Sequence, residues 1–370
     1  MKIRKLFYKD LSGLRFVGMI CIFTYVITYI LTTQNSSNFS KELLLFSSTL
    51  KNTGISIFLI ISSFLITALG LREYKYFSKF SLLKFYYRRG LRLFPALCLA
   101  LIFYFVVHPL LIYFLNLTPI SDENQFYNLF FLPSSYQNLT REVLIYLYFI
   151  YGIFVIIQYY LIWGVVLKYL NKYLMFISIL FVIIGITFKY ADTISSFSTY
   201  MYLPFYFYEI GIGAITAILV RGNSSIINVI KTTSSSVIGF IYFSGISIAL
   251  LVYIVSDSSL ISLLTKLYSC LIFSFYIFEQ TFAKHSLFKM RNSQFTIQLG
   301  NLSYSFILFA PIISVIILIA LESTEISLNS NVSMLVFPVV CFFSTWVISY
   351  FYHHYIDRFF SEIRKELRPI

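Results

Sequence analysis

Charged residues are scarce in this chain of 370 residues, where Asp, Glu, Lys and Arg together make up only 12%. Hydrophobic residues make up 59%, and the mean hydropathy is +0.82. This composition excludes a soluble globular protein and predicts an integral membrane protein. The net charge of +13 does not indicate a nucleic-acid partner, because membrane proteins concentrate Lys and Arg in their cytoplasmic loops.

Cysteine is also rare, and its placement excludes two further classes. The chain has four cysteines, each inside an apolar segment: Cys21, Cys98, Cys270 and Cys341. This spacing fits neither a disulfide framework nor a metal site. The first apolar run lacks a small-residue cleavage site, so we expect a retained helix and no signal peptide. No linker, composition shift or internal repeat divides the sequence, which predicts one membrane domain over residues 1–370.

Long apolar runs are what the chain has in abundance. A spanning helix needs about 20 mostly apolar residues. Ten segments meet this requirement approximately: 13–32, 52–71, 93–115, 143–167, 173–188, 203–220, 236–255, 260–278, 298–320 and 332–352. The fold class predicted is therefore an all-α, polytopic membrane protein with about ten transmembrane helices.

The distribution of Lys and Arg predicts the orientation of these segments. With the N-terminus inside, the inner segments hold 23 of the 28 Lys and Arg residues, and the outer loops hold four. Positive residues accumulate on the cytoplasmic side. We therefore expect both termini in the cytoplasm, and a multi-pass protein of the inner (cytoplasmic) membrane with the lipid bilayer as its first partner.

The most basic connection lies between the second and third segments and reads "LREYKYFSKFSLLKFYYRRGLRLFPA". Arg88, Arg89 and Arg92 lie directly before the third segment, and Arg89 and Arg92 share one helical face. Two interpretations are open. The basic residues anchor an amphipathic interfacial helix on anionic lipid, at about 1 kcal/mol each, or they bind a phosphate-bearing ligand from the cytoplasm.

Six sequence segments resemble the membrane acyltransferase family 3, and they occur in the family's order over nearly the whole chain. They read "LSGLRFVGMICIF" (11–23), "GISIFLIISSFLIT" with "SLLKFYYRRGLRLFPA" (54–67 and 81–96), "LPFYFYEIGIGAITAIL" (203–219), "LGNLSYSFILFAP" (299–311) and "YHHYIDRFF" (352–360). The resemblance implies an acyl group, often acetyl, taken from cytoplasmic acyl-CoA and placed on a hydroxyl of an envelope saccharide or lipid-linked glycan.

The resemblance also implies roles for particular residues. Arg15, Arg88, Arg89 and Arg92 would bind the phosphates of acyl-CoA, which is a donor substrate and not a permanently bound cofactor. No metal is implied. The residues expected to line the cavity are Tyr25, Val26, Gln158, Tyr159 and Glu209.

The chain departs from the family pattern at the positions that handle protons. In the family's first helix ten residues separate an Arg from a His, and counting from Arg15 that position is Val26 here. The neighbouring phenol of Tyr25 is a poor base, since tyrosine ionises only near pH 10. Ile156 and Ile157 stand where the family often has two acids. Acyl transfer to a hydroxyl needs a base, and an intramembrane His108 in "YFVVHPLLIYF" is the candidate for it. His353 and His354 lie at the cytoplasmic end of the last segment, near the level of the arginines.

Three functions stay open on these residues. The first is an acyltransferase with an altered base. The second is a catalytically inactive pseudoenzyme that acts as a partner or regulator of another membrane protein. The third is a glycan exporter, although a transporter should show repeat symmetry or interrupted helices in matching halves, and the sequence has neither.

The topology can be tested by labelling single cysteines from each side of the membrane. Asn38, Ser121 and Asn329 lie in predicted outer loops, so a cysteine at each should react with an impermeant maleimide added to the outer face. Labelling of any of them only from the cytoplasmic face would contradict the orientation.

Overall fold

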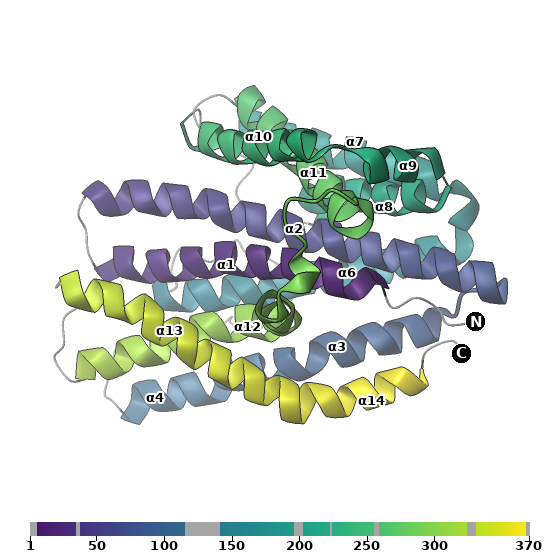
Figure 1. Ribbon diagram of the computed structural model, residues 1–370. Coiled ribbons are helices and arrows are strands. Elements are labelled where there is room, and N and C mark those ends of the chain that lie inside the picture. Colours follow the sequence, from purple (N-terminus) through teal and green to yellow (C-terminus); the bar gives the residue numbers. More distant parts are fainter. Residues whose placement is uncertain are drawn as a thin grey trace. The chain divides into compact units, whose positions relative to one another are not determined.

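The computed structural model describes residues 6–34, 38–114, 141–195, 203–222, 224–254, 259–323 and 331–367. Within these ranges the chain forms helices and short turns, and no strand occurs in them (Figure 1). The predicted all-α class is therefore confirmed for the part of the chain that is described.

Thirteen α-helices and five shorter helical segments make up this part of the chain. The α-helices are α1 (Leu6–Gln34), α2 (Asn38–Phe77), α3 (Leu82–Ile102), α4 (His108–Phe114), α6 (Arg141–Tyr169), α7 (Leu174–Ser195), α8 (Phe207–Gly222), α9 (Ser224–Thr232), α10 (Ser235–Ile254), α11 (Ser259–Phe282), α12 (Gln294–Ser323), α13 (Asn331–Phe351) and α14 (Arg358–Glu366). Two short segments are π-helical, η1 (Phe103–Val107) and η6 (Tyr352–Asp357). Three are 3₁₀-helical, η3 (Asn171–Tyr173), η4 (Leu203–Tyr206) and η5 (Met290–Asn292).

Eight helical stretches in the described residues are long and apolar enough to cross a membrane, or nine if the bent pair α9 and α10 forms one span. Eight of the ten predicted segments fall on the eight stretches, 236–255 falls on the bent pair, and 260–278 falls in α11. These helices support a multi-pass membrane protein. The basic residues from Leu82 on do not form a separate interfacial helix, because α3 continues from them directly into the apolar segment.

The chain divides into two compact units, each assembled from distant parts of the sequence. The first unit comprises Met1–Ile22, Ser48–Ser81 and Trp163–Ser303, and the second comprises Phe23–Ser47, Leu82–Ile162 and Tyr304–Ile370. Neither unit corresponds to a continuous stretch of sequence. The prediction of one domain over 1–370 stays a prediction.

Glycines allow close packing in the first unit. A Cβ on Gly211 of α8 would lie 2.6 Å from the carbonyl oxygen of Ser178 in α7, and a Cβ on Gly213 would lie 2.5 Å from the carbonyl oxygen of Ile60 in α2. Small residues let membrane helices approach at the backbone. A buried hydrogen bond from Ser63 Oγ to the carbonyl oxygen of Ile210, at 2.5 Å, joins α2 and α8 at the same level.

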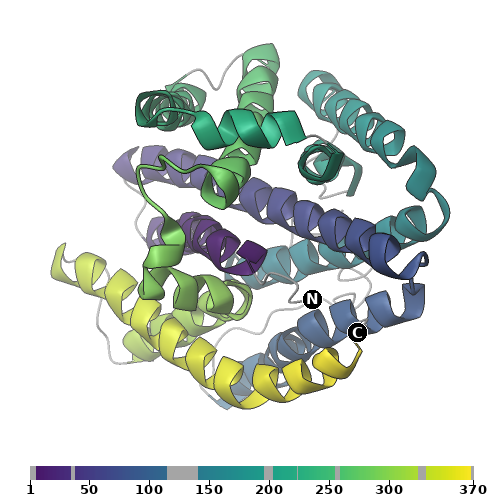
Figure 2. The same cartoon turned by 45° about the vertical axis from the view of Figure 1, so that its right-hand side comes forward.

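The second unit has an aromatic centre. The rings of Phe23 in α1, Phe306 in α12 and Phe342 in α13 contact one another, with centroids 5.4–5.6 Å apart. The two pairs that include Phe23 are edge to face, which adds about 0.5–1.5 kcal/mol per pair to the burial of the rings. In the same unit η6 and α14 pack against α3, and both views show α14 running alongside α3 (Figures 1 and 2).

The contact at Gly213 predicts a destabilising substitution with a matched control. Gly213→Ala should lower stability by about 1–3 kcal/mol, because the added methyl overlaps the Ile60 carbonyl and forces α2 and α8 apart. Gly152→Ala is the control, since a Cβ there would meet no atom of the described residues within 4 Å. Thermal unfolding in detergent should show a lower melting temperature for the first variant only, and equal melting temperatures would contradict the close approach.

Candidate functional site

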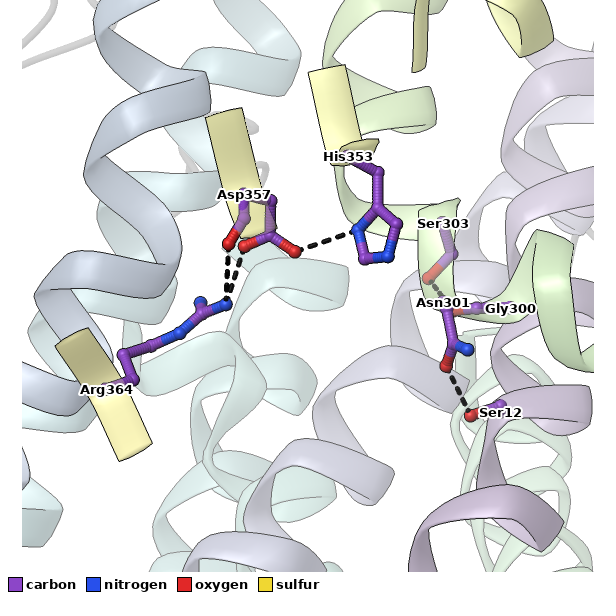
Figure 3. A network of polar contacts seen from close by, with 7 residues as sticks. All are labelled: Ser12, Gly300, Asn301, Ser303, His353, Asp357 and Arg364. Carbon is purple, nitrogen blue, oxygen red and sulfur yellow. Dashed lines mark hydrogen bonds and ion pairs between the residues drawn. The ribbon is translucent and has the colours of Figure 1, made fainter. Parts of the chain in front are cut away.

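The structure brings together, within each unit, the segments on which the family resemblance rests. In the first unit, Ser12 Oγ of α1 donates to Asn301 Oδ1 of α12 at 2.9 Å, and Ser303 Oγ donates to the carbonyl oxygen of Gly300 at 2.8 Å (Figure 3). A side chain at Gly300 would overlap the backbone of Ser12. The "LSGLRF" and "LGNLSYS" segments therefore form one close helix crossing.

A second pair of segments meets around Glu209 in α8, also in the first unit. Glu209 is only 2% exposed, and its Oε1 accepts a hydrogen bond from Ser56 Oγ of α2 at 3.2 Å. The Glu209 Oε2 atom has no hydrogen-bond partner among the described residues. Placing an ionisable side chain inside a membrane protein is costly, so this buried carboxyl group is a strong candidate for a function. Ser56 stands where the family has Asp.

Arg88, Arg89 and Arg92 form the basic turn of α3. Neutral groups of the second unit hold this turn in place. Arg88 Nη1 donates to the carbonyl oxygen of Leu367, at the end of α14, at 3.0 Å. The Arg89 guanidinium carbon lies 5.6 Å from the ring centroid of Phe85 and 5.5 Å from that of Tyr160. These separations are typical of cation–π contacts, so two of the three arginine heads have defined positions.

Two further hydrogen bonds fix α3 itself. Tyr86 Oη donates to the carbonyl oxygen of Leu161 in α6 at 2.8 Å. Tyr304 Oη of α12, in the "LGNLSYS" segment, donates to the carbonyl oxygen of Leu93 at 3.1 Å. The arginines therefore project from a helix that three other elements hold in register.

Arg15 belongs to the first unit, whereas Arg88, Arg89 and Arg92 belong to the second. The three loop arginines lie within two turns of α3, as the sequence predicted. Their association with Arg15 in one anion site stays a prediction.

The residues expected to line the cavity have different environments. Val26 is fully buried, with 0% exposure, and Tyr159 is also buried. Tyr25 is half-buried and its ring lies 6.0 Å from that of Tyr29, whereas Gln158 is exposed. These four belong to the second unit and Glu209 to the first. The exposed amide of Gln158 and the buried methyls of Val26 are poor candidates for handling a proton.

The predicted base His108 lies at the start of α4, directly after η1. Its side chain is 2% exposed, and its ring centroid lies 6.3 Å from that of Phe103. The backbone N–H of His108 donates to the carbonyl oxygen of Phe103. Ile156 and Ile157, at the positions of the family's acids, are half-buried. A buried imidazole next to an aromatic ring fits a structural role at least as well as a catalytic one.

The sequence analysis missed a buried polar cluster at the end of α11. Glu279 and Gln280 are both fully buried. Glu279 Oε2 accepts hydrogen bonds from Tyr242 Oη at 3.1 Å and from Gln280 Nε2 at 2.7 Å. Glu279 Oε1 accepts one from Ser286 Oγ. Lys289 Nζ donates to the carbonyl oxygens of Glu279 and Gln280 at 2.5 and 2.8 Å. The signal was an acid and an amide side by side just beyond the predicted 260–278 segment.

Substitutions at Val26 test whether a site persists at the position of the family's histidine. Val26→His should lower stability by about 1–3 kcal/mol, because a larger ring overpacks the buried position and its nitrogens lack water. Val26→Thr is the control: it has nearly the same shape, and a helical Thr hydroxyl can donate to the carbonyl four residues earlier. Equal melting temperatures for both variants, together with a gain of acyl transfer by Val26→His, would show that the position opens onto an active site.

No family model, curated protein or solved structure matches this chain. The assignment of a function therefore depends on the residues and geometry described above. Two sites carry most of that information: the buried Glu209 carboxyl group of the first unit, and the basic turn of α3 with its partners in the second.

Proposed function

We propose that the protein is an acyltransferase-3-like protein of the inner membrane. It binds acyl-CoA through the basic turn of α3 and transfers the acyl group, most simply acetyl, to a hydroxyl of an envelope saccharide or lipid-linked glycan. The ordered sequence resemblance supports the family, and the pairing of the resembling segments within each unit is consistent with it.

The excess of positive charge around α3 is the observation that carries the proposal. Together α3, η6 and α14 contain seven Lys and Arg residues and three Asp and Glu residues. Two of the acids form ion pairs within their own helical stretch, Asp357 with Arg364 and Glu362 with Lys365, each at 2.6 Å. A multiply charged anion is the ligand that relieves such an excess, and guanidinium groups suit phosphate because they donate two parallel hydrogen bonds.

The pseudoenzyme is a second candidate, and the burial of Val26 favours it. If the site of the family's histidine is filled by packed side chains, the scaffold can keep its donor-binding surface without the original chemistry. Both candidates predict CoA binding. The acyltransferase predicts that labelled acetyl groups pass from acetyl-CoA to an acceptor in membranes. The pseudoenzyme predicts that they stay on acetyl-CoA.

Loss of one arginine should weaken CoA binding without unfolding the protein. We expect Arg92→Met to lower CoA affinity by roughly 1.5–3 kcal/mol, or about 10–150-fold, because one charge-assisted bond to phosphate is lost while the apolar stem is kept. The measurement is calorimetric titration of CoA into purified protein in nanodiscs of zwitterionic lipid, where anionic headgroups do not compete.

Lys172→Met is the matched control for this experiment, since Lys172 is an exposed basic residue at a predicted inner connection. Its affinity for CoA should equal that of the wild type. Wild-type protein that binds vesicles of anionic lipid but has no affinity for CoA would show that the basic turn is a lipid anchor, and the donor assignment would be wrong.

A further inference from the structure

His353, Asp357 and Arg364 are joined by two polar contacts in η6 and α14, the last two helical elements of the chain that the structure describes. His353 Nδ1 lies 2.9 Å from Asp357 Oδ2, and Arg364 Nη2 lies 2.6 Å from Asp357 Oδ1 (Figure 3). Each carboxylate oxygen therefore has its own cationic or donor partner. When Nδ1 donates to the carboxylate, the neutral imidazole carries its free lone pair on Nε2.

His353 is more exposed than Asp357, as a base that must reach its substrate and the acid that orients it require. The His353 side chain is 46% exposed, whereas Asp357 and Arg364 are 21% and 15% exposed. The neighbouring His354 is engaged differently: its ring stacks on Tyr350 and meets Tyr355 edge to face. Within the described part of the chain, His353 is the one of these two histidines that pairs with a carboxylate.

The backbone at this position is unusual. The described residues contain two π-helical segments, and His353 lies inside one of them, η6. Single π-helical turns inside α-helices are rare and occur frequently at functional sites. Because η6 packs against α3 within the second unit, the histidine lies on an element that contacts the helix of the basic turn.

We propose that His353 is the general base of acyl transfer, held by Asp357 and Arg364, in place of the histidine absent from position 26. This inference rests on the proposed function, since it needs acyl-CoA as donor. His353 is the catalytic residue, and Asp357 and Arg364 are positioning residues. Nδ1 is fixed by a carboxylate, and no hydrogen bond to Nε2 comes from the described residues. An imidazole in this arrangement is prepared to act as the base for a hydroxyl nucleophile.

The reaction balances with the donor and the acceptor alone. Nε2 of His353 takes the proton of the acceptor hydroxyl as its oxygen bonds to the thioester carbonyl carbon. The carbon–sulfur bond then breaks, and the departing thiolate takes the proton from the imidazolium. The products are an ester and free CoA, and the imidazole returns to its neutral form.

The location of His353 limits the acceptor. It follows the predicted span 332–352 at the end where positive residues accumulate, which is the cytoplasmic end. The acceptor hydroxyl must therefore reach the cytoplasmic face, as a saccharide carried on a lipid of the inner leaflet would. An acceptor confined to the outer face would not meet this base.

The first test measures the reactivity of the histidines themselves. Diethyl pyrocarbonate is added to purified protein in nanodiscs, and carbethoxylation of each histidine is followed by peptide mass spectrometry. His353 should react faster than His354, added CoA should protect His353, and Asp357→Asn should slow its reaction. If His353 reacts no faster than His354, or if Asp357→Asn leaves its rate unchanged, the base is assigned wrongly.

The second test measures transfer from labelled acetyl-CoA in inverted membrane vesicles, which expose the cytoplasmic face and contain the endogenous acceptors. His353→Gln should lower transfer by about 10²–10⁴-fold with unchanged CoA affinity, whereas His354→Gln should keep wild-type transfer. Added imidazole should restore part of the activity of His353→Gly but not that of Asp357→Asn, a rescue that a structural role would not give.

The outcomes separate this inference from the proposed function. Wild-type protein without CoA affinity overturns the proposed function and, with it, the base. CoA affinity with transfer that survives His353→Gln overturns the base alone. CoA affinity with no transfer by the wild type also overturns the base and favours the pseudoenzyme.

Discussion

The absence of water in a bilayer's hydrocarbon core is the constraint on which this structure depends. A polar group there must find its partner in the chain, because an unsatisfied one costs several kcal/mol. Several hydroxyl groups in the described helices meet this requirement locally, as Thr216 and Ser274 do by donating to carbonyl oxygens four residues earlier. Indole and hydroxyl also pair between helices, as in the 2.9 Å bond from Trp163 Nε1 to Thr67 Oγ1. Among the described residues Glu209 Oε2 has no such partner, and neither have the buried hydroxyl groups of Thr345 and Ser349. The carboxyl group is the most costly of these to bury, because it is ionisable.

The same constraint explains why two kinds of helix contact occur in the two units. Where α7, α8 and α2 approach at the backbone, glycines provide the room and dispersion forces provide the stability. Where α3 carries charge, it is held by single long-range hydrogen bonds from Tyr86, Tyr304 and Arg88 to backbone carbonyls. A carbonyl accepts a second hydrogen bond without loss of the helix, so these contacts fix the basic turn and leave the helix intact.

Hydropathy and charge could predict the all-α class and nearly all the long helices, because apolar length is a local property of the sequence. They could not predict that residues 82–92 join the following span as one helix, since a basic amphipathic segment is equally stable at an interface. The Arg88, Arg89 and Arg92 group could be predicted from spacing. The pairing of His353 with Asp357 and Arg364 could not, because a spacing of four residues brings side chains together on any helix, and the sequence does not reveal which pairs bond or that a π-helical turn intervenes.

The π-helical turn η6 buffers the orientation of α14 against a change in chain length. Each residue of an α-helix turns the chain by about 100°, and a π-helical turn accommodates one residue more than the hydrogen-bonding pattern on either side of it. Deletion of a single residue within Tyr352–Asp357 would let the α-helical pattern run unbroken from α13 into α14. Because η6 already absorbs that residue, α14 would keep nearly its present orientation, whereas a deletion in the regular turns of α13 would rotate everything that follows it by about 100°. The π-helical turn is thus the place where this helix can lose one residue while Arg88 and Leu367 stay within reach of each other.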